Sequence, residues 1–195
     1  MKELLQQIGP ADETARQAAR KNWNACMKPL GSLGLLEKAL EDIAALTGSA
    51  EIRLKKRAAL VLCADNGVVA QGVTQCGSEM TGIVARNLAA GITSVCRMAA
   101  EADCPVIPVD MGILDFPETE GVLSRRIANG TKDISQGPAM TRAQAEQAIF
   151  TGVELVREQK EQGVRLLATG EMGIGNTTTS SAAASVLLNR PASEM

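Results

Sequence analysis

The residues best suited to chemistry lie in a glycine-rich segment, residues 170–178, which reads GEMGIGNTT. Glycines let a backbone approach a ligand closely, and the N–H groups that open a helix attract phosphate. Asn176, Thr177 and Thr178 add side-chain donors. The segment therefore predicts a site for the phosphoribosyl part of a nucleotide. The alternative is a glycine turn that only packs a helix against a strand, because the pattern is neither a Walker loop nor the G-x-G-x-x-G of a dinucleotide fingerprint.

Three carboxylates follow predicted strands and give a second candidate feature. Asp65 and Asp110 come directly after short apolar runs, and Glu171 stands just after a third. Ligands bind outside the carboxyl ends of the strands in open parallel sheets, so the three are expected at one edge. Each could instead cap a turn or a helix. As a set they could also hold Mg²⁺ with oxygen ligands, as in a metal-dependent α/β enzyme.

The residue types that are missing or isolated exclude other chemistry. The chain has no histidine, which excludes His-based triads and His metal sites. Its five cysteines form no C-x-x-C pair, and this fits reduced thiols in the cytoplasm. Cys76 is either a reactive thiol or a bystander.

Composition gives no sign of a nucleic-acid or membrane partner. The formal net charge is −2, and aromatic residues make up 2% of the 195 residues. This balance offers neither a basic patch nor the stacking platforms of single-strand binders. No apolar run approaches the roughly 20 residues that span a bilayer, and the first residues do not resemble a signal peptide.

The elements that must position these residues follow from the apolar pattern. Helices are expected at residues 11–21 and 33–46, the second capped by Ser32 and burying Leu33, Leu36, Leu40 and Ile43. Strands at 58–64, 106–109 and 164–168 then alternate with helices at 80–89, 94–102, 141–162 and 177–188. The sequence thus predicts an α/β fold, a parallel sheet flanked by helices, with a helical subdomain at 1–50 and an α/β domain at 51–195.

Two further loops are candidates for ligand contact. Residues 28–34, KPLGSLG, form either a ligand loop or ordinary Pro/Gly punctuation before a helix. Residues 65–74 either line a pocket or simply connect a strand to a helix.

The sequence resembles the nicotinate-nucleotide–dimethylbenzimidazole phosphoribosyltransferases of cobalamin nucleotide-loop assembly. Five segments carry the resemblance, in order along the chain: KPLGSLGLLE, ADNGVVAQGVT, VDMGI, ANGTKDISQGPAMT and GEMGIGNTTT. The resemblance implies a Rossmann-like sheet with a smaller helical domain, a homodimer, and transfer of phosphoribose from nicotinate mononucleotide to a benzimidazole-type base. The products are nicotinate and an α-ribazole phosphate. No metal or cofactor is implied.

The resemblance also implies roles for individual residues. The glycine-rich segment would hold phosphate and ribose, Glu171 would support developing positive charge, and the loop after the first strand would lie beside the acceptor base. The implied substrate-binding residues are Pro29, Gly31, Ser32, Asp65, Cys76, Met80, Gly170, Glu171, Met172, Gly173, Ile174, Gly175, Asn176, Thr177 and Thr178.

The chain departs from the family at three points. Asn66 stands where many members have His, and aliphatic Ile83 and Val84 stand near a Gln that contacts the base in some members. Purines and phenols therefore stay open as acceptors. Members also continue well past the point equivalent to Met195, and their general-base glutamate lies in that part. The sheet is thus expected to be incomplete, and the chain to be the N-terminal portion of an enzyme, inactive by itself; the alternatives are a non-catalytic nucleotide-binding fragment or half of a split enzyme.

Overall fold

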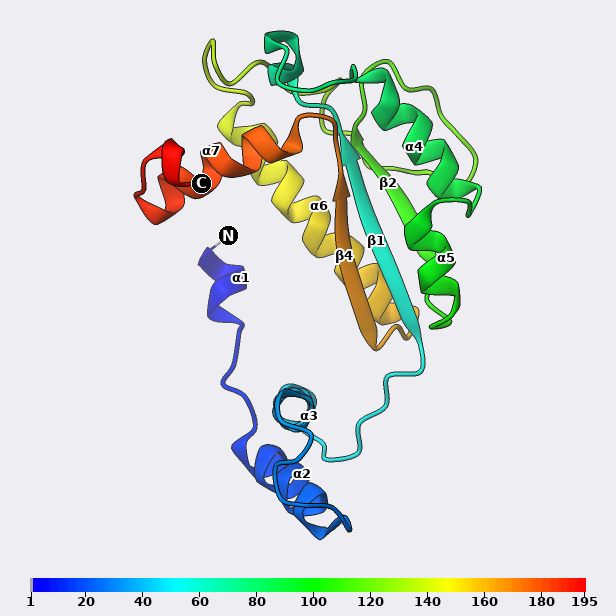
Figure 1. The fold of residues 1–195 in the computed structure, drawn as a ribbon, viewed down its shortest axis with the longest axis vertical. Helices are drawn as coiled ribbons and strands as arrows, with labels where there is room; N and C mark the ends of the chain where they lie inside the picture. The colour runs from blue at the N-terminus through cyan, green and yellow to red at the C-terminus, as the bar shows by residue number, and fades with distance from the viewer. Residues whose placement is uncertain (1) are drawn as a thin grey trace. The chain divides into compact units, whose positions relative to one another are not determined.

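The computed structural model describes residues 2–195, with side chains from residue 4 onward. The chain divides into two compact units, Met1–Leu54 and Lys55–Met195. The first is helical, and the second contains the sheet (Figure 1).

The N-terminal unit contains α1 (Lys2–Gln6), α2 (Glu13–Ala25) and α3 (Leu35–Thr47). Asp12 caps α2, because its carboxylate accepts the N–H of Ala15 at 2.9 Å. The prediction from the sequence that Ser32 caps α3 is wrong. The N-cap is Gly34 at φ 54°, and the chain before it forms turns that delay the helix to Leu35.

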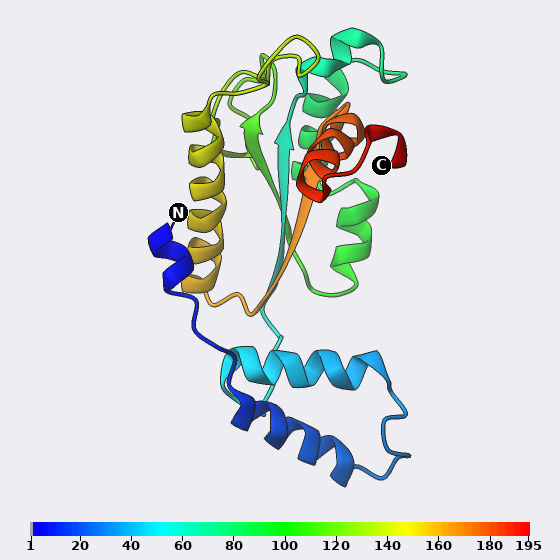
Figure 2. The same cartoon turned by 90° about the vertical axis from the view of Figure 1, so that its left-hand side faces the viewer.

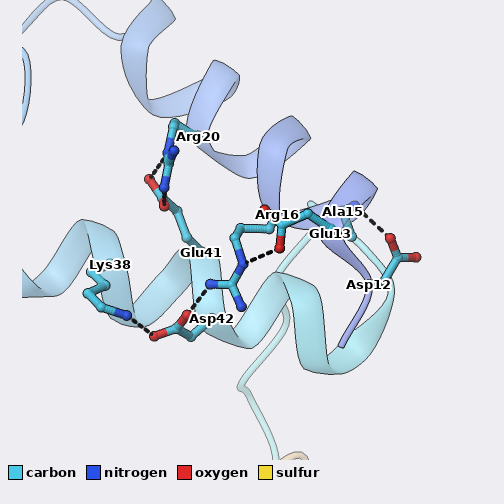
Figure 3. Close-up of polar contacts among 8 residues, drawn as sticks. All are labelled: Asp12, Glu13, Ala15, Arg16, Arg20, Lys38, Glu41 and Asp42. Carbon is cyan, nitrogen blue, oxygen red and sulfur yellow. Dashed lines mark hydrogen bonds and ion pairs between the residues drawn. The ribbon is translucent and has the colours of Figure 1, made fainter. Parts of the chain in front are cut away.

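The predicted buried face of α3 is wrong at Leu33 and Leu36, while Leu40 and Ile43 are half-buried. Leu33 and Leu36 keep 44% and 54% of their surface exposed, whereas Glu37 and Glu41 are buried. The reason is that α2 and α3 meet through small alanines flanked by ion pairs. Two nitrogens of Arg20 donate to the carboxylate of Glu41, and the shorter hydrogen bond is 2.7 Å long. Figure 3 shows this ion pair. Glu37 receives the ammonium of Lys28 at 2.7 Å.

The C-terminal unit is built on a parallel sheet, as predicted. Its strands are β1 (Arg57–Ala64), β2 (Val106–Gly112), β3 (Leu123–Ser124) and β4 (Leu166–Met172), in the order β3-β2-β1-β4. Every neighbouring pair is parallel. β1 is central and almost continuously buried, which explains its apolar run. β3 has only two residues, too few for a pattern to predict it.

Helices cover both faces of this sheet. In Figure 2, α6 (Arg142–Glu161) lies on one side of the strands, and α4 (Glu79–Ala89) and α5 (Ser94–Ala100) lie on the other. Alternation along β1 matches the two layers: Leu60 packs with Val109 and Leu155 of α6, while Val61 packs in the cluster that contains Leu88 of α4. α6 opens with the predicted capping box of Thr141 and Gln144.

The remaining elements are α7 (Asn176–Leu188) and two short 3₁₀ helices, η1 (Gly67–Gln71) and η2 (Ala192–Glu194). β4 is an edge strand, and most of its residues are exposed. α7 is apolar yet exposed, with Val186 at 81% and Leu187 at 84%. The expectation of an incomplete sheet stays a prediction. Among residues 2–195, no helix combines the length and the apolarity needed to cross a bilayer.

Candidate functional site

The glycine-rich segment divides among three structural elements. Gly170, Glu171 and Met172 belong to β4, because they continue the parallel register opposite Val61, Leu62 and Cys63. Asn176, Thr177 and Thr178 form the first turn of α7. Only residues 173–175 are loop, so the strand extends further than the sequence pattern indicated.

The loop itself is a type II β-turn. The N–H of Asn176 donates to the carbonyl of Gly173 at 3.1 Å, and Gly175 adopts φ 82° and ψ 1°. A type II turn needs positive φ at its third residue, which explains the glycine at 175. The turn delivers the chain directly from the end of β4 into the N-terminus of α7.

Long-range contacts hold this turn against the end of β1. The Thr81 hydroxyl of α4 accepts the N–H of Ile174 at 3.1 Å, and the Asn66 amide donates to the carbonyl of Ile174 at 3.0 Å. Asn66 also accepts the hydroxyl of Thr179 in α7 at 3.1 Å. Gly173 is buried so tightly that an added Cβ would lie 2.2 Å from the carbonyl oxygen of Ala64. The position of the turn is therefore set by β1, α4 and α7 together.

This arrangement leaves hydrogen-bond donors at the N-terminus of α7. Within residues 2–195, the backbone N–H groups of Gly175 and Thr177 donate to no protein acceptor. They stand at the positive end of the helix dipole, beside the hydroxyls of Thr177 and Thr178. An anion of phosphate size matches such a set of donors.

Glu171 lies beside these donors and keeps an exposed side chain. Its carboxylate accepts the side-chain amide of Asn176. Desolvation by the surrounding atoms raises the pKa of Glu171, and the Asn176 amide partly offsets this by lowering it. Glu171 is thus an exposed carboxyl group next to the N-terminus of α7.

Asp110 has a different role from the one that its position suggested. It is 4% exposed, and one carboxylate oxygen accepts the N–H groups of Gly112 and Ile113 at 3.0 and 2.8 Å. The other receives the guanidinium of Arg126 at 2.8 and 3.1 Å. These four donors leave Asp110 no capacity for a ligand, so it fixes the end of β2.

Asp65 is also buried, at 3% exposure. Its Oδ2 accepts the N–H of Leu114 at 2.8 Å, and its Oδ1 has no hydrogen-bond partner. Burial raises the pKa of Asp65, while the nearby Thr81 hydroxyl and the Leu114 N–H lower it. Asp65 therefore ties the loop after β1 to the chain that follows β2.

The three carboxylates do gather at one end of the sheet. The pKa of the Cys63 thiol is raised to about 12, chiefly by burial, and the charges of Glu171, Asp110 and Asp65 contribute to that rise. Over the part of the chain that the structure describes, however, no three Asp, Glu, Cys or His side chains are placed to hold a metal ion. The hypothesis of a Mg²⁺ enzyme thus finds no built site here.

The other predicted site residues lie in two places. Cys76 is exposed just before α4, and Met80 is half-buried in its first turn. Pro29, Gly31 and Ser32 are exposed in the turns between α2 and α3, within the N-terminal unit. Their roles stay predictions.

Sequence reasoning missed two contributors and one cavity. Thr81 and Asn66 contact the turn although each lies more than 90 residues before it in the sequence. The only hint in the sequence was that a polar residue, Asn66, directly follows Asp65. A cavity of about 700 Å³ also opens at this edge, between the ends of β1 and β2 and the start of α6. Its walls are mostly apolar, with Ala64, Met111 and Met140 among them.

Comparisons with known proteins identify a family for this chain. Residues 8–195 match a family model described as phosphoribosyltransferase. The nicotinate-nucleotide–dimethylbenzimidazole phosphoribosyltransferase of Ruminiclostridium cellulolyticum is 43% identical over 193 residues, which are 99% of this chain and 55% of that protein. The protein of the same name from Acetivibrio thermocellus is 40% identical with the same coverage.

Solved structures give the same picture. The nicotinate-nucleotide–dimethylbenzimidazole phosphoribosyltransferase of Thermus thermophilus superposes with a TM-score of 0.86 at 38% identity, covering 92% of this chain and 55% of that one. The chain spans about half the length of the curated relatives it matches.

Proposed function

This chain belongs to the phosphoribosyltransferase family, and from that premise we propose that it binds the phosphoribosyl group of nicotinate mononucleotide at the turn before α7. The observation that carries the proposal is the type II turn with its free N–H groups at Gly175 and Thr177. These donors would receive the 5′-phosphate, and the exposed Glu171 would lie toward the ribose.

The reaction we propose is transfer of phosphoribose to 5,6-dimethylbenzimidazole or a related base, giving α-ribazole 5′-phosphate and nicotinate. Displacement at the anomeric carbon builds positive charge there, and a carboxylate such as Glu171 stabilises it. The attacking azole must also lose a proton to a base. Asp110 is fully engaged and Asp65 is buried, so neither meets the geometry for this role.

The general base is therefore proposed to lie in the part of the relatives that this chain does not match. The chain would then bind nucleotide without turnover by itself, as a fragment or as half of a split enzyme. Assaying release of nicotinate from nicotinate mononucleotide, with and without dimethylbenzimidazole, separates this alternative from a complete enzyme.

Calorimetric titration with nicotinate mononucleotide tests the site. We expect binding of the nucleotide and much weaker binding of nicotinate riboside, which lacks the phosphate. Gly173→Trp should abolish binding, because Gly173 has no room for a side chain. Gly152→Trp is the matched control, since an added Cβ at Gly152 in α6 meets nothing within 4 Å. No binding by a folded wild-type chain would contradict the proposal.

The acceptor base is proposed to lie beside Cys76 and Met80. The apolar cavity next to Met111 is a second candidate, because its volume of about 700 Å³ is ample for a bicyclic base. Methyl-labelled methionine NMR distinguishes the two. Dimethylbenzimidazole should shift the Met80 signal in the first case and the Met111 signal in the second.

Assembly and location are proposed by the same resemblance. We propose a homodimer in the cytoplasm, with small molecules and neither nucleic acid nor membrane as partners. Exposed apolar side chains in the N-terminal unit, among them Leu30 at 75% and Leu35 at 84%, support self-association. Sedimentation equilibrium tests the dimer.

A further inference from the structure

We propose that Asn66 is a positioning residue that fixes the orientation of the peptide between Ile174 and Gly175 and thereby aims the Gly175 N–H at the ligand. The inference rests on the proposed function for the identity of that ligand. The contact itself is independent of it: the Asn66 amide nitrogen lies 3.0 Å from the Ile174 carbonyl oxygen.

A planar peptide makes this contact an orienting one. The carbonyl of Ile174 and the N–H of Gly175 belong to the same peptide unit, and in the trans form they point in opposite directions. Holding the carbonyl toward Asn66 therefore directs the N–H of Gly175 away from Asn66. That N–H has no protein acceptor among residues 2–195 and stands at the N-cap of α7.

The orientation needs such a device because the alternative is accessible. Type I and type II turns differ by a flip of their central peptide, which here is the unit between Ile174 and Gly175. The flip would bring Gly175 from its φ of 82° to a negative φ, which glycine adopts equally well. In the flipped turn, the Ile174 carbonyl oxygen would face the phosphate and repel it.

Asn66 is itself held in the orientation that this role requires. Its oxygen accepts the Thr179 hydroxyl at 3.1 Å, so its nitrogen must face the turn. Packing adds to this, because an added Cβ at Gly175 would lie 3.6 Å from Cβ of Asn66 and 3.0 Å from Val69. The neighbouring peptide is fixed separately, since the Ile174 N–H donates to Thr81. Asn66 is therefore the side chain that holds the central peptide of the turn by a hydrogen bond.

The test uses Asn66→Ala, with Asn129→Ala as a matched control. Asn129 lies on the same edge and its amide likewise bonds to backbone and side-chain groups, namely the N–H and carboxylate of Asp115 and, at 3.5 Å, the guanidinium of Arg126, but it does not contact the turn. Two measurements are made on each isotope-labelled chain. The first is the sequential cross-relaxation between the Ile174 α-proton and the Gly175 amide proton, which is strong in a type II turn and weak in type I. The second is the dissociation constant for nicotinate mononucleotide.

We expect Asn66→Ala to lose about half of the strong cross-relaxation and to bind about twofold more weakly, because removing one hydrogen bond that biases an otherwise near-even equilibrium leaves about half of the chains in the binding turn. Asn129→Ala should change neither. A type II signal retained in full in Asn66→Ala, or a weakened signal with unchanged affinity, overturns the inference. If the wild-type chain does not bind the nucleotide, the proposed function fails for this chain, and the cross-relaxation alone decides the role of Asn66.

Discussion

Replacing Gly173 by alanine should destabilise the C-terminal unit, mainly through one contact with backbone. The added Cβ would lie 2.2 Å from the carbonyl oxygen of Ala64, which is backbone at the end of β1 and has no rotamer to change. The two segments must separate by about 0.8 Å to restore a tolerable contact, and overpacking of this kind costs about 1–3 kcal/mol. The loss of unfolded-state freedom on going from glycine to alanine offsets about 0.4–1 kcal/mol of that. The net expectation is a loss of about 1–2 kcal/mol.

The assay is urea unfolding followed by circular dichroism, with Gly152→Ala as the control. Gly152 lies inside α6 with open space around it, so alanine there should raise stability by up to about 1 kcal/mol. Trp23 is the single tryptophan and lies in α2, so its fluorescence reports on the N-terminal unit in the same samples. Equal free energies of unfolding for the two alanine variants would refute the close approach of the turn to β1.

Three other expectations follow from the same edge of the sheet. Arg126→Met should lower the free energy of unfolding by about 3 kcal/mol, because it leaves the buried Asp110 carboxylate without its ion-pair partner; a loss below about 1 kcal/mol in a chemical melt would contradict this. Burial raises the folded-state pKa of Asp65 above its unfolded value, so ionisation of Asp65 opposes folding. The free energy of unfolding of Asp65→Asn, relative to that of the wild type, should therefore grow as pH rises above about 3.9. Urea melts at several pH values check that slope, and a pH-independent difference would count against it. A thiol reagent at pH 8 should label exposed Cys26 and Cys76 but not buried Cys63, whose pKa is about 12. Mass spectrometry of protein labelled in its native state measures this, and labelling of Cys63 would contradict the prediction.

The sheet could be predicted because its central strands, β1 and β2, are largely buried. The apolar run of β1 has only one comfortable place in a globular protein, the centre of a parallel sheet. β3 escaped prediction because it pairs through Leu123 and Ser124 alone. The end of β4 was placed too early, since glycine and glutamate are weak strand formers and only pairing with β1 draws Gly170 and Glu171 into the sheet.

The leucines of α3 gave a wrong prediction for a related reason. Helical periodicity identifies an apolar stripe, but it does not say which stripe meets a neighbour. In α3 the contact with α2 runs through Ala44, Ala45 and the ion-paired glutamates. The position of a charged partner on another helix is not encoded in local spacing.

At the candidate site, the sequence predicted which residues could bind a ligand, but not the distant residues that hold them in place. The glycines and the threonines that open α7 are adjacent in sequence, so their joint role is visible in one segment. Asn66 reaches Ile174 across 108 residues of chain, and Thr81 reaches it across 93. Such contacts depend on the register of β1 and β4, which only the fold supplies.

The charged contacts of α3 make the stability of the N-terminal unit depend on pH. Hydrogen bonds from Lys28 and Arg20 lower the pKa of Glu37 and Glu41 below their ordinary values. Lower folded-state pKa values contribute stability that is present above the ordinary glutamate pKa of about 4.3 and lost as pH falls through the folded values. Acidification below about pH 4.3 should therefore loosen the contacts of α3 with Arg20 and Lys28, whereas the packing of Leu60, Val109 and Leu155 at the sheet contains no titrating group. The N-terminal unit thus contains a helix contact whose strength depends on proton concentration.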